Sequence, residues 1–255
     1  MRELLVWEQN WLRQCGWSSE QIAALSVSND QTPVEYLTGR ARFIDLILQV
    51  NRQVLIPRVE TEQLIELVKQ AVWQSGTTIN SIVEVGTGSG AIAIALARAL
   101  PSVTIVATDI SEGALSCARA NVHHYFLDER IKLLWADLLI HSQLPPADNY
   151  FLVANLPYIP TRDYQKLDTC VREYEPRLAL DGGADGFEVI RHLLKQVAPL
   201  ENKPLGIFLE VDSSHSLDFV RDYNQYQWQK VTDEFGRGRF LVGTRIDKID
   251  ANHNE

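Results

Sequence analysis

The chain has 255 residues, of which 45% are hydrophobic and 22% are charged, and its formal net charge at pH 7 is −9. This length suits one large domain, or one domain with a small extension. No apolar run approaches the length of a membrane span, and the first residues lack the pattern of a signal peptide. The acidic balance argues against a general affinity for nucleic acid. Cys15, Cys117 and Cys170 are odd in number and widely spaced, which argues against a disulfide framework or a zinc cluster and favours a reduced cytoplasmic enzyme.

The first part of the chain is predicted to form a short helical extension over residues 1–39. Apolar residues recur there at helical spacing, Gly16 interrupts them, and Ser18 or Ser19 begins a second helix. A short helical turn follows over residues 33–39 and ends in glycine. The aromatic residues of this extension are expected to be packing residues.

Residues 40–56 are predicted to form a β-hairpin that connects the extension to the main domain. Two β-rich runs, 41–50 and 53–56, flank Asn51 and Arg52. Two such runs around a polar dipeptide are typical of a hairpin.

The main domain is predicted to span residues 57–246, followed by a disordered tail over 247–255. After an opening helix, strands and helices alternate along this domain. Such repetition predicts an α/β fold with a doubly wound, Rossmann-like sheet that is mostly parallel and has an antiparallel terminal hairpin at one edge. The predicted strands are 82–85, 104–108, 131–135, 150–154, 206–211, 229–232 and 239–242, and a helix is expected over 217–223 before the last two.

A glycine loop and two strand-end carboxylates predict a nucleoside cofactor. The first strand leads into Gly86-Thr87-Gly88-Ser89-Gly90, a loop that can aim backbone N–H groups at a ligand. Position 91 is alanine, so the dinucleotide pattern is not met. Asp109 ends the second strand, where a carboxylate can take both ribose hydroxyls, and Asp137 ends the third, where it can meet an adenine amino group. Together with Glu84 these carboxylates suit the cationic S-adenosyl-L-methionine and predict a class I methyltransferase, although each alone could be a helix cap.

The segment Asn155-Leu156-Pro157-Tyr158 follows the fourth strand, and Pro157 stops that strand at the carboxyl edge of the sheet. The side-chain oxygen of Asn155 and the backbone carbonyl of Leu156 can accept hydrogen bonds from a nitrogen that is to be methylated. Tyr158 can lie over the planar group that carries this nitrogen. We therefore expect the segment to hold the methyl acceptor, with Asn155, Pro157 and Tyr158 in catalytic roles.

With these motifs the sequence resembles the HemK-type protein-(glutamine N5) methyltransferases, which modify peptide chain release factors. The resemblance runs from about Pro33 to Thr244. Beside the glycine loop it rests on three blocks, Pro33-Val34-Glu35-Tyr36-Leu37-Thr38-Gly39, Leu55-Ile56-Pro57-Arg58-Val59-Glu60-Thr61-Glu62, and Val171-Arg172-Glu173-Tyr174-Glu175-Pro176-Arg177-Leu178-Ala179-Leu180 with Gly182-Gly183-Ala184-Asp185-Gly186.

The resemblance implies a methyl transfer from S-adenosyl-L-methionine to the glutamine side chain of a Gly-Gly-Gln loop in a release factor. It implies that Asn155 to Tyr158 hold this glutamine. It also implies that the cofactor contacts Gly86 to Gly90, Asp109, Asp137 with Leu138, and Asn155. We expect a cytoplasmic monomer without a metal, a membrane or a direct contact to nucleic acid.

Three departures from the family pattern leave alternatives open. The family motif is Asn-Pro-Pro-Tyr, whereas position 156 is leucine in this chain. The family has a Glu-x-Gly sequence after the fifth strand, where this chain has Glu210-Val211-Asp212. The helical domain before Pro33 is also shorter than in the family. Asn-Leu-Pro-Tyr is the form found in ribosomal RNA adenine dimethyltransferases. An N6-adenine methyltransferase acting on RNA or DNA is therefore the alternative, and a domain that only binds a partner is a third interpretation.

Overall fold

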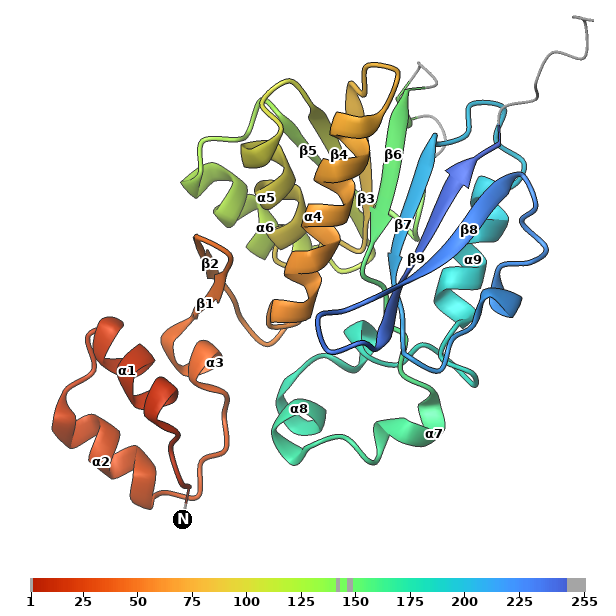
Figure 1. The fold of residues 1–255 in the computed structure, drawn as a ribbon. Coiled ribbons are helices and arrows are strands. Elements are labelled where there is room, and N and C mark those ends of the chain that lie inside the picture. Colours follow the sequence, from red (N-terminus) through yellow and green to blue (C-terminus); the bar gives the residue numbers. More distant parts are fainter. Residues whose placement is uncertain (1, 141–142, 146–148, 247–255) are drawn as a thin grey trace, which may run out of the picture.

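The structure is a computed structural model that describes residues 2–140, 143–145 and 149–246. A seven-stranded sheet in the order β5-β4-β3-β6-β7-β9-β8 forms its centre (Figure 1). The first five strands of this order are parallel, and β9 runs antiparallel to both β7 and β8. The predicted doubly wound sheet with an antiparallel hairpin is therefore confirmed. The strands are β3 (Ser81–Val85), β4 (Thr104–Asp109), β5 (Ile131–Trp135), β6 (Tyr150–Ala154), β7 (Gly206–Glu210), β8 (Tyr226–Thr232) and β9 (Gly238–Arg245).

Helices cover both faces of the sheet, because successive side chains of a buried strand point to opposite sides and each side needs an apolar cover. Ile82 packs into a cluster with α4 (Val59–Gln74) and α5 (Ala91–Ala99). Its neighbour Val83 packs into a second cluster with α9 (Glu188–Val197). Figure 1 shows α4 in front of the sheet and α9 behind it. A further helix, α6 (Glu112–His124), contacts β4 and β5.

The predicted amino-terminal helices are α1 (Val6–Gln14), α2 (Ser19–Val27) and α3 (Val34–Thr38). They enclose an apolar cluster of their own, which is separate from the two clusters of the sheet. Ser18 caps α2, since its hydroxyl accepts a hydrogen bond from the backbone N–H of Gln21.

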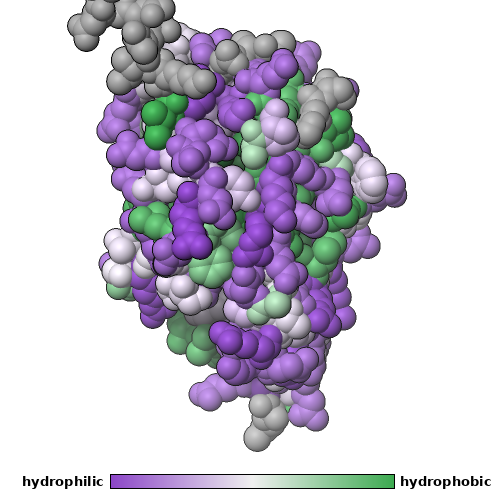
Figure 2. Space-filling view, turned by 90° about the vertical axis from the view of Figure 1, so that its right-hand side faces the viewer, coloured by the Kyte–Doolittle hydropathy of each residue, from purple (hydrophilic) through white to green (hydrophobic). Residues whose placement is uncertain are grey.

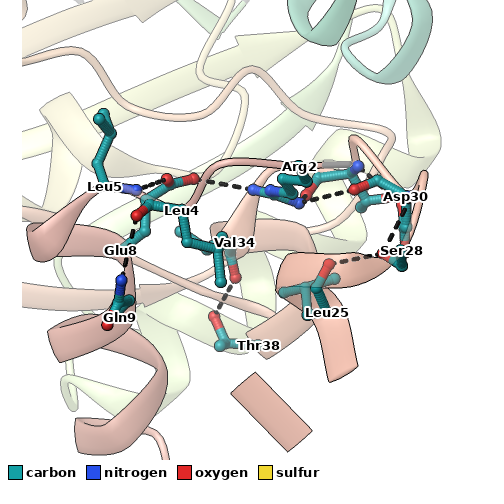
Figure 3. A network of polar contacts seen from close by, with 11 residues as sticks. Arg2, Leu4, Leu5, Glu8, Gln9, Leu25, Ser28, Asp30, Val34 and Thr38 are labelled. Atoms are coloured by element: carbon teal, nitrogen blue, oxygen red, sulfur yellow. Dashed lines mark hydrogen bonds and ion pairs between the residues drawn. The ribbon is translucent and has the colours of Figure 1, made fainter. Parts of the chain in front are cut away.

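A buried arginine joins the beginning of this unit to the loop after α2 (Figure 3). Arg2 is 8% exposed and forms an ion pair of 2.8 Å with Glu8. Its guanidinium also donates to the backbone oxygens of Thr32 and Asp30, at 2.5 and 3.3 Å. The second carboxylate oxygen of Glu8 accepts from the N–H of Leu5 at 2.7 Å, so one side chain caps α1 and neutralises the buried cation.

The connecting hairpin turns at a different place from the predicted one. Its strands are β1 (Arg40–Phe43) and β2 (Leu46–Gln49), and the chain turns at Ile44, whose φ is 54°. The prediction of a turn at 51–52 and a second strand at 53–56 was wrong. Apolar residues of 53–56 are buried against α6 instead of in a strand pair, and burial alone produced the β-like pattern.

The carboxyl-terminal third also differs from the prediction. The helix expected over 217–223 is only a 3-10 turn, η3 (Leu217–Phe219). Three short elements were not predicted, and they lie below the carboxyl ends of the parallel strands in Figure 1. They are α7 (Thr161–Tyr164), α8 (Thr169–Tyr174) and η2 (Arg177–Ala179). The tail that was expected to be disordered, 247–255, lies outside the described residues.

The surface beside the terminal hairpin is mostly hydrophilic, with single apolar residues scattered over it (Figure 2). The edge strand β8 carries Lys230 and an irregular register at Val231 and Thr232, features that oppose pairing with another chain. Among the helices that the structure describes, none is both long and apolar enough to cross a membrane.

Candidate active site

A cavity of about 760 Å³ opens at the carboxyl ends of β3, β4 and β6. This is the size of a pocket for a small-molecule ligand, and it lies where ligands bind in open α/β sheets. Most of the residues that the sequence predicted for the site line it. These are Gly86, Thr87, Gly88, Ser89, Asp109, Asp137, Leu138, Asn155, Leu156 and Pro157. Gly90 and Tyr158 lie next to these residues in the chain but do not line the cavity.

The glycine loop fits closely against the chain around it. Gly86 has a φ of 75°, and a Cβ added there would lie 2.8 Å from Cδ2 of Leu156. Gly86 and Thr87 both donate their backbone N–H groups to the carbonyl of Thr108, at 2.9 Å. Gly90, with a φ of 83°, is the residue before α5. These positive φ angles favour glycine and shape the loop over the end of β4.

Asp109 holds the glycine loop and the loop after β4 together. One of its carboxylate oxygens accepts from the N–H of Gly88, and the other accepts from the N–H of Ser111, each at 2.9 Å. Burial raises the pKa of Asp109, and these hydrogen bonds lower it. Because each carboxylate oxygen has two lone pairs, each can accept one further bond from a ligand hydroxyl. The residue is thus both a loop cap and a candidate partner for a ribose diol.

The segment after β5 forms the wall next to Asp109. Asp137 is exposed at the rim, while Leu138 is 9% exposed and has a φ of 67°. A leucine in this left-handed conformation costs roughly 1–2 kcal/mol and needs outside support. The support comes from Thr108, whose hydroxyl donates to the carbonyl of Leu138 at 2.7 Å. An apolar wall with a polar rim suits a flat heterocycle.

Glu84 lies behind the glycine loop and is not part of the cavity wall. Its side chain is fully buried, and one oxygen accepts from the hydroxyl of Thr87 at 2.7 Å. The other oxygen has no hydrogen-bond partner among the described residues. Burial raises the pKa of Glu84 to about 8, against the hydrogen bond from Thr87, which lowers it. A carboxyl in this position responds electrostatically to a cation bound beyond the loop.

Asn155 lies at the cavity wall, and its side-chain amide is held by a hydrogen bond on the side away from the cavity. Its Nδ2 donates to Oγ1 of Thr61 at 3.0 Å, and the hydroxyl of Thr61 donates to Glu210 at 2.7 Å. Tyr158 was expected to lie over the methyl acceptor. Its hydroxyl donates to the second carboxylate oxygen of Glu210, at 3.2 Å. Burial raises the pKa values of both Glu210 and Tyr158.

An ion pair joins α4 to the loop that follows β6 and carries α8. Arg58 donates to Glu175 at 2.6 Å, and the second oxygen of this carboxylate accepts from the backbone N–H of Ile56 at 3.4 Å. The carboxylate side chain is 2% exposed and the guanidinium is 32% exposed at the cavity. The pair therefore closes one side of the cavity with a cation facing inward.

Gly182 lies directly against the segment that follows Asn155. A Cβ on Gly182 would lie 2.6 Å from the carbonyl oxygen of Pro157 and 2.5 Å from that of Gly186. The backbone N–H of Gly182 donates to the carbonyl of Ile159 at 2.8 Å. Only a residue without a side chain permits this approach.

The sequence did not identify several of these residues individually. Each lies in a block that carried the family resemblance, or in the Glu-x-Asp segment after the fifth strand. The residue types alone did not indicate which strand of the sheet each of these blocks would contact. The residues concerned are Arg58, Thr61, Glu175, Gly182 and Glu210.

The residues at the cavity fit a nucleoside cofactor with a cationic centre. Asp109 can accept two hydroxyls, the wall around Leu138 can cover a purine, and the backbone of the glycine loop leaves room for close approach. In the described part of the chain, no group of three or more histidine, cysteine or acidic residues could hold a metal ion.

Comparisons with known proteins agree with this chemistry. A family model described as a methyltransferase domain matches residues 82–178. The release factor glutamine methyltransferase of Gloeobacter violaceus is 41% identical over 70% of the chain, and that of Moorella thermoacetica is 40% identical over 85%. The match covers 62% of the length of the first relative and 76% of the second. Among solved structures, the amino-terminal domain of human METTL16 in complex with SAH has a TM-score of 0.56 at 16% identity, covering 78% of the chain and 76% of that domain.

Proposed function

Because the chain belongs to the family of release factor glutamine methyltransferases, we propose that it transfers a methyl group from S-adenosyl-L-methionine to a glutamine of a release factor. The acceptor is the side-chain amide nitrogen in the Gly-Gly-Gln loop. The observation that carries the proposal is the position of Asn155, which lies at the cavity wall with its Nδ2 bound to Thr61. The side-chain oxygen that remains is a hydrogen-bond acceptor at the end of β6.

The chain's own residues divide between the two ligands. Asp109 accepts the ribose hydroxyls, the wall formed by Asp137 and Leu138 takes the adenine, and the backbone of residues 86–90 lies along the rest of the cofactor. When bound, S-adenosyl-L-methionine supplies a methyl group that its sulfonium activates.

The acceptor amide is held by residues 155–158. An amide nitrogen is a poor nucleophile because its lone pair is delocalised. Asn155 and the carbonyl of Leu156 accept its two N–H bonds, which orients the nitrogen and raises its electron density. Leucine keeps the backbone acceptor that the family's proline offers, and it packs on Gly86. Tyr158 acts through Glu210 in this scheme, as a support behind the site.

The domain boundaries are also part of the proposal. Residues 1–39 form a docking unit for the release factor, 40–56 connect it, and 57–246 carry the reaction. The separate apolar cluster of the first unit supports this division. We place the reaction in the cytoplasm and treat the enzyme as a monomer, which light scattering of the purified protein tests.

The experiment that tests the proposed function offers two classes of acceptor side by side. Purified protein is incubated with radiolabelled S-adenosyl-L-methionine and either release factors or 30S ribosomal RNA. We expect label in the release factor, and a tryptic peptide with the Gly-Gly-Gln loop that is heavier by one CH₂ unit, because a methyl group replaces one hydrogen of the amide nitrogen. A release factor in which this glutamine is replaced is the matched control. Label in RNA and none in protein would overturn the proposal in favour of N6-adenine methylation.

A further inference from the structure

A chain of side-chain hydrogen bonds runs from the cavity wall into the core. It begins at Nδ2 of Asn155, which donates to Oγ1 of Thr61 at 3.0 Å. The hydroxyl of Thr61 donates to Glu210 at 2.7 Å, and the hydroxyl of Tyr158 donates to the other oxygen of the same carboxylate at 3.2 Å. Thr61 is 4% exposed and Glu210 is 1% exposed. The chain links α4, the end of β6 and the end of β7, over sequence separations of 94 and 149 residues.

Counting protons along this chain fixes the direction of every bond. A carboxylate only accepts hydrogen bonds, so Glu210 takes the single proton of the Thr61 hydroxyl. Burial raises the pKa of Glu210, and two hydroxyl donors together with the guanidinium of Arg239, 3.9 Å away, oppose this shift and stabilise the carboxylate. Oγ1 of Thr61 can then only accept from its other neighbour. Of the two ends of the Asn155 amide, only Nδ2 can donate, so Oδ1 must be the end that is left for the cavity.

We propose that Thr61 and Glu210 are positioning residues that hold the amide of Asn155 with its oxygen toward the methyl acceptor. The inference deepens the proposed function and rests on it for the identity of the acceptor. Within the described part of the chain, Oδ1 of Asn155 accepts no hydrogen bond, so it is available to a ligand. The hydrogen bond that Thr61 donates to Glu210 thereby determines that the cavity accepts a hydrogen-bond donor at Asn155.

The orientation matters because the two ends of an asparagine amide have the same shape and opposite hydrogen-bonding character. With Oδ1 in the cavity, the site accepts a bond from a nitrogen that bears hydrogen. With the amide turned over, an N–H₂ group would face the N–H bonds of the acceptor, and both would be left unpaired in a buried place. A site that must bind the nitrogen to be methylated therefore needs a contact that prevents rotation of the asparagine amide.

Two kinds of substitution can be distinguished: those that leave the Asn155 amide free to rotate, and those that turn it over. Thr61→Val keeps the shape of the side chain and removes the hydroxyl, so the amide of Asn155 becomes free to turn. Thr61→Ser restores the hydroxyl. In Glu210→Gln the guanidinium of Arg239, 3.9 Å from the oxygen that Tyr158 binds, favours the oxygen of the new amide on that side, so the N–H₂ group faces Thr61 and donates to it. The proton of Thr61 then goes to Oδ1 of Asn155, which turns the amide over.

The first measurement is steady-state methylation of a release factor. We expect kcat to fall roughly 10- to 100-fold in Thr61→Val, as for a misplaced reactive geometry. Glu210→Gln should lose at least as much, and Thr61→Ser should recover most of the activity. The dissociation constant of S-adenosyl-L-methionine, measured by calorimetry, should stay within about twofold, because Asp109, Asp137 and Leu138, which hold the cofactor in the proposed scheme, are unchanged. Tyr226→Phe is the matched control, since it removes another buried hydroxyl, bound to the carbonyl of Pro204 at 3.1 Å, outside the cavity. It should keep kcat.

The second measurement needs no substrate, so it stands even if the proposed function fails. In protein labelled with ¹⁵N-asparagine, the side-chain N–H₂ signal of Asn155 is identified by its loss in Asn155→Ala. We expect this signal to be protected from exchange with solvent in the wild type and in Thr61→Ser, and to exchange faster in Thr61→Val. Equal exchange in all three proteins would overturn the proposal. So would a Thr61→Val enzyme with unchanged kcat. A wild type that methylates no release factor, with the protection intact, would count against the proposed function alone.

Discussion

The guanidinium of Arg58 lies 2.6 Å from the carboxylate of Glu175, and this ion pair joins segments that are 117 residues apart in the sequence. Arg58 directly precedes α4, and Glu175 directly follows α8. The pair thus fixes the loop after β6 against the start of α4, at one side of the cavity. Two of the blocks that carried the family resemblance meet in this contact.

Replacing Arg58 with alanine should lower the free energy of unfolding by about 3 kcal/mol, because it leaves the buried carboxylate of Glu175 without its partner. Urea denaturation followed by circular dichroism measures this. Arg162→Ala is the matched control, since Arg162 is 81% exposed in its pair with Asp163 and should contribute less than about 1 kcal/mol. Combining Arg58→Ala with Glu175→Gln should recover part of the loss. Strict additivity of the two changes would contradict the coupling.

Gly182→Ala should damage the reaction more than the fold. The new Cβ would meet the carbonyl oxygen of Pro157 at 2.6 Å, and neither backbone can yield without moving the acceptor segment. We expect kcat/KM for the release factor to fall about 100-fold, as for a displacement near 1 Å. Gly76→Ala is the control, because no atom lies within 4 Å of a Cβ there. Equal activity of the two variants would rule out a supporting role for Gly182.

Asn155→Ala and Asp109→Ala should have opposite kinetic signatures. Loss of the Asn155 amide removes the orientation of the acceptor, so turnover should fall by at least 100-fold while the affinity for S-adenosyl-L-methionine changes little. Loss of the Asp109 carboxylate, which also caps the glycine loop, should weaken cofactor binding about tenfold or more. Calorimetry and single-turnover assays separate the two effects. An unchanged dissociation constant in Asp109→Ala would exclude Asp109 from the cofactor site.

Glu84→Gln should change how stability depends on pH. Burial raises the pKa of Glu84 from 4.5 to about 8, so between these values the folded protein keeps a proton that the unfolded chain has lost. The stability that comes from this proton is complete below pH 4.5 and is lost as the pH rises through about 8. Glutamine cannot ionise, so the Tm of the variant should increase relative to that of the wild type as the pH rises, and the difference should become constant above about pH 8. A Tm difference that does not change with pH would show that folding does not raise the pKa of Glu84.

The sequence was sufficient to predict the parts of the site that follow from local chemistry. Asp109 and Asn155 end strands, and parallel strands bring their carboxyl ends to one edge, so the strand pattern alone placed both at one cavity. The glycine loop could be recognised for the same reason, since its positive φ angles at Gly86, Gly88 and Gly90 demand the residue type that the sequence displays.

The rest depends on contacts between distant segments, which one sequence does not encode in a readable pattern. Thr61 could be seen as part of a specific block, but not as the partner of Asn155, because the bond spans 94 residues. The bond between Tyr158 and Glu210 was not predicted for the same reason, since it spans 52 residues. The hairpin error arose from burial. The run over 53–56 is apolar because it packs on α6, and burial and strand pairing produce the same pattern.

The separation of 149 positions between Thr61 and Glu210 also determines when the site can exist during synthesis of the protein. A ribosome that adds about 5–20 residues per second needs roughly 7–30 s to pass from one to the other. Until then the glycine loop, β4 and Asn155 can have left the exit tunnel, yet the carboxylate that directs the amide is missing. The nascent chain therefore acquires the cofactor loop well before it acquires a correctly directed acceptor site. In the proposed scheme the acceptor site is complete only after β7 has been synthesised and has paired with β6.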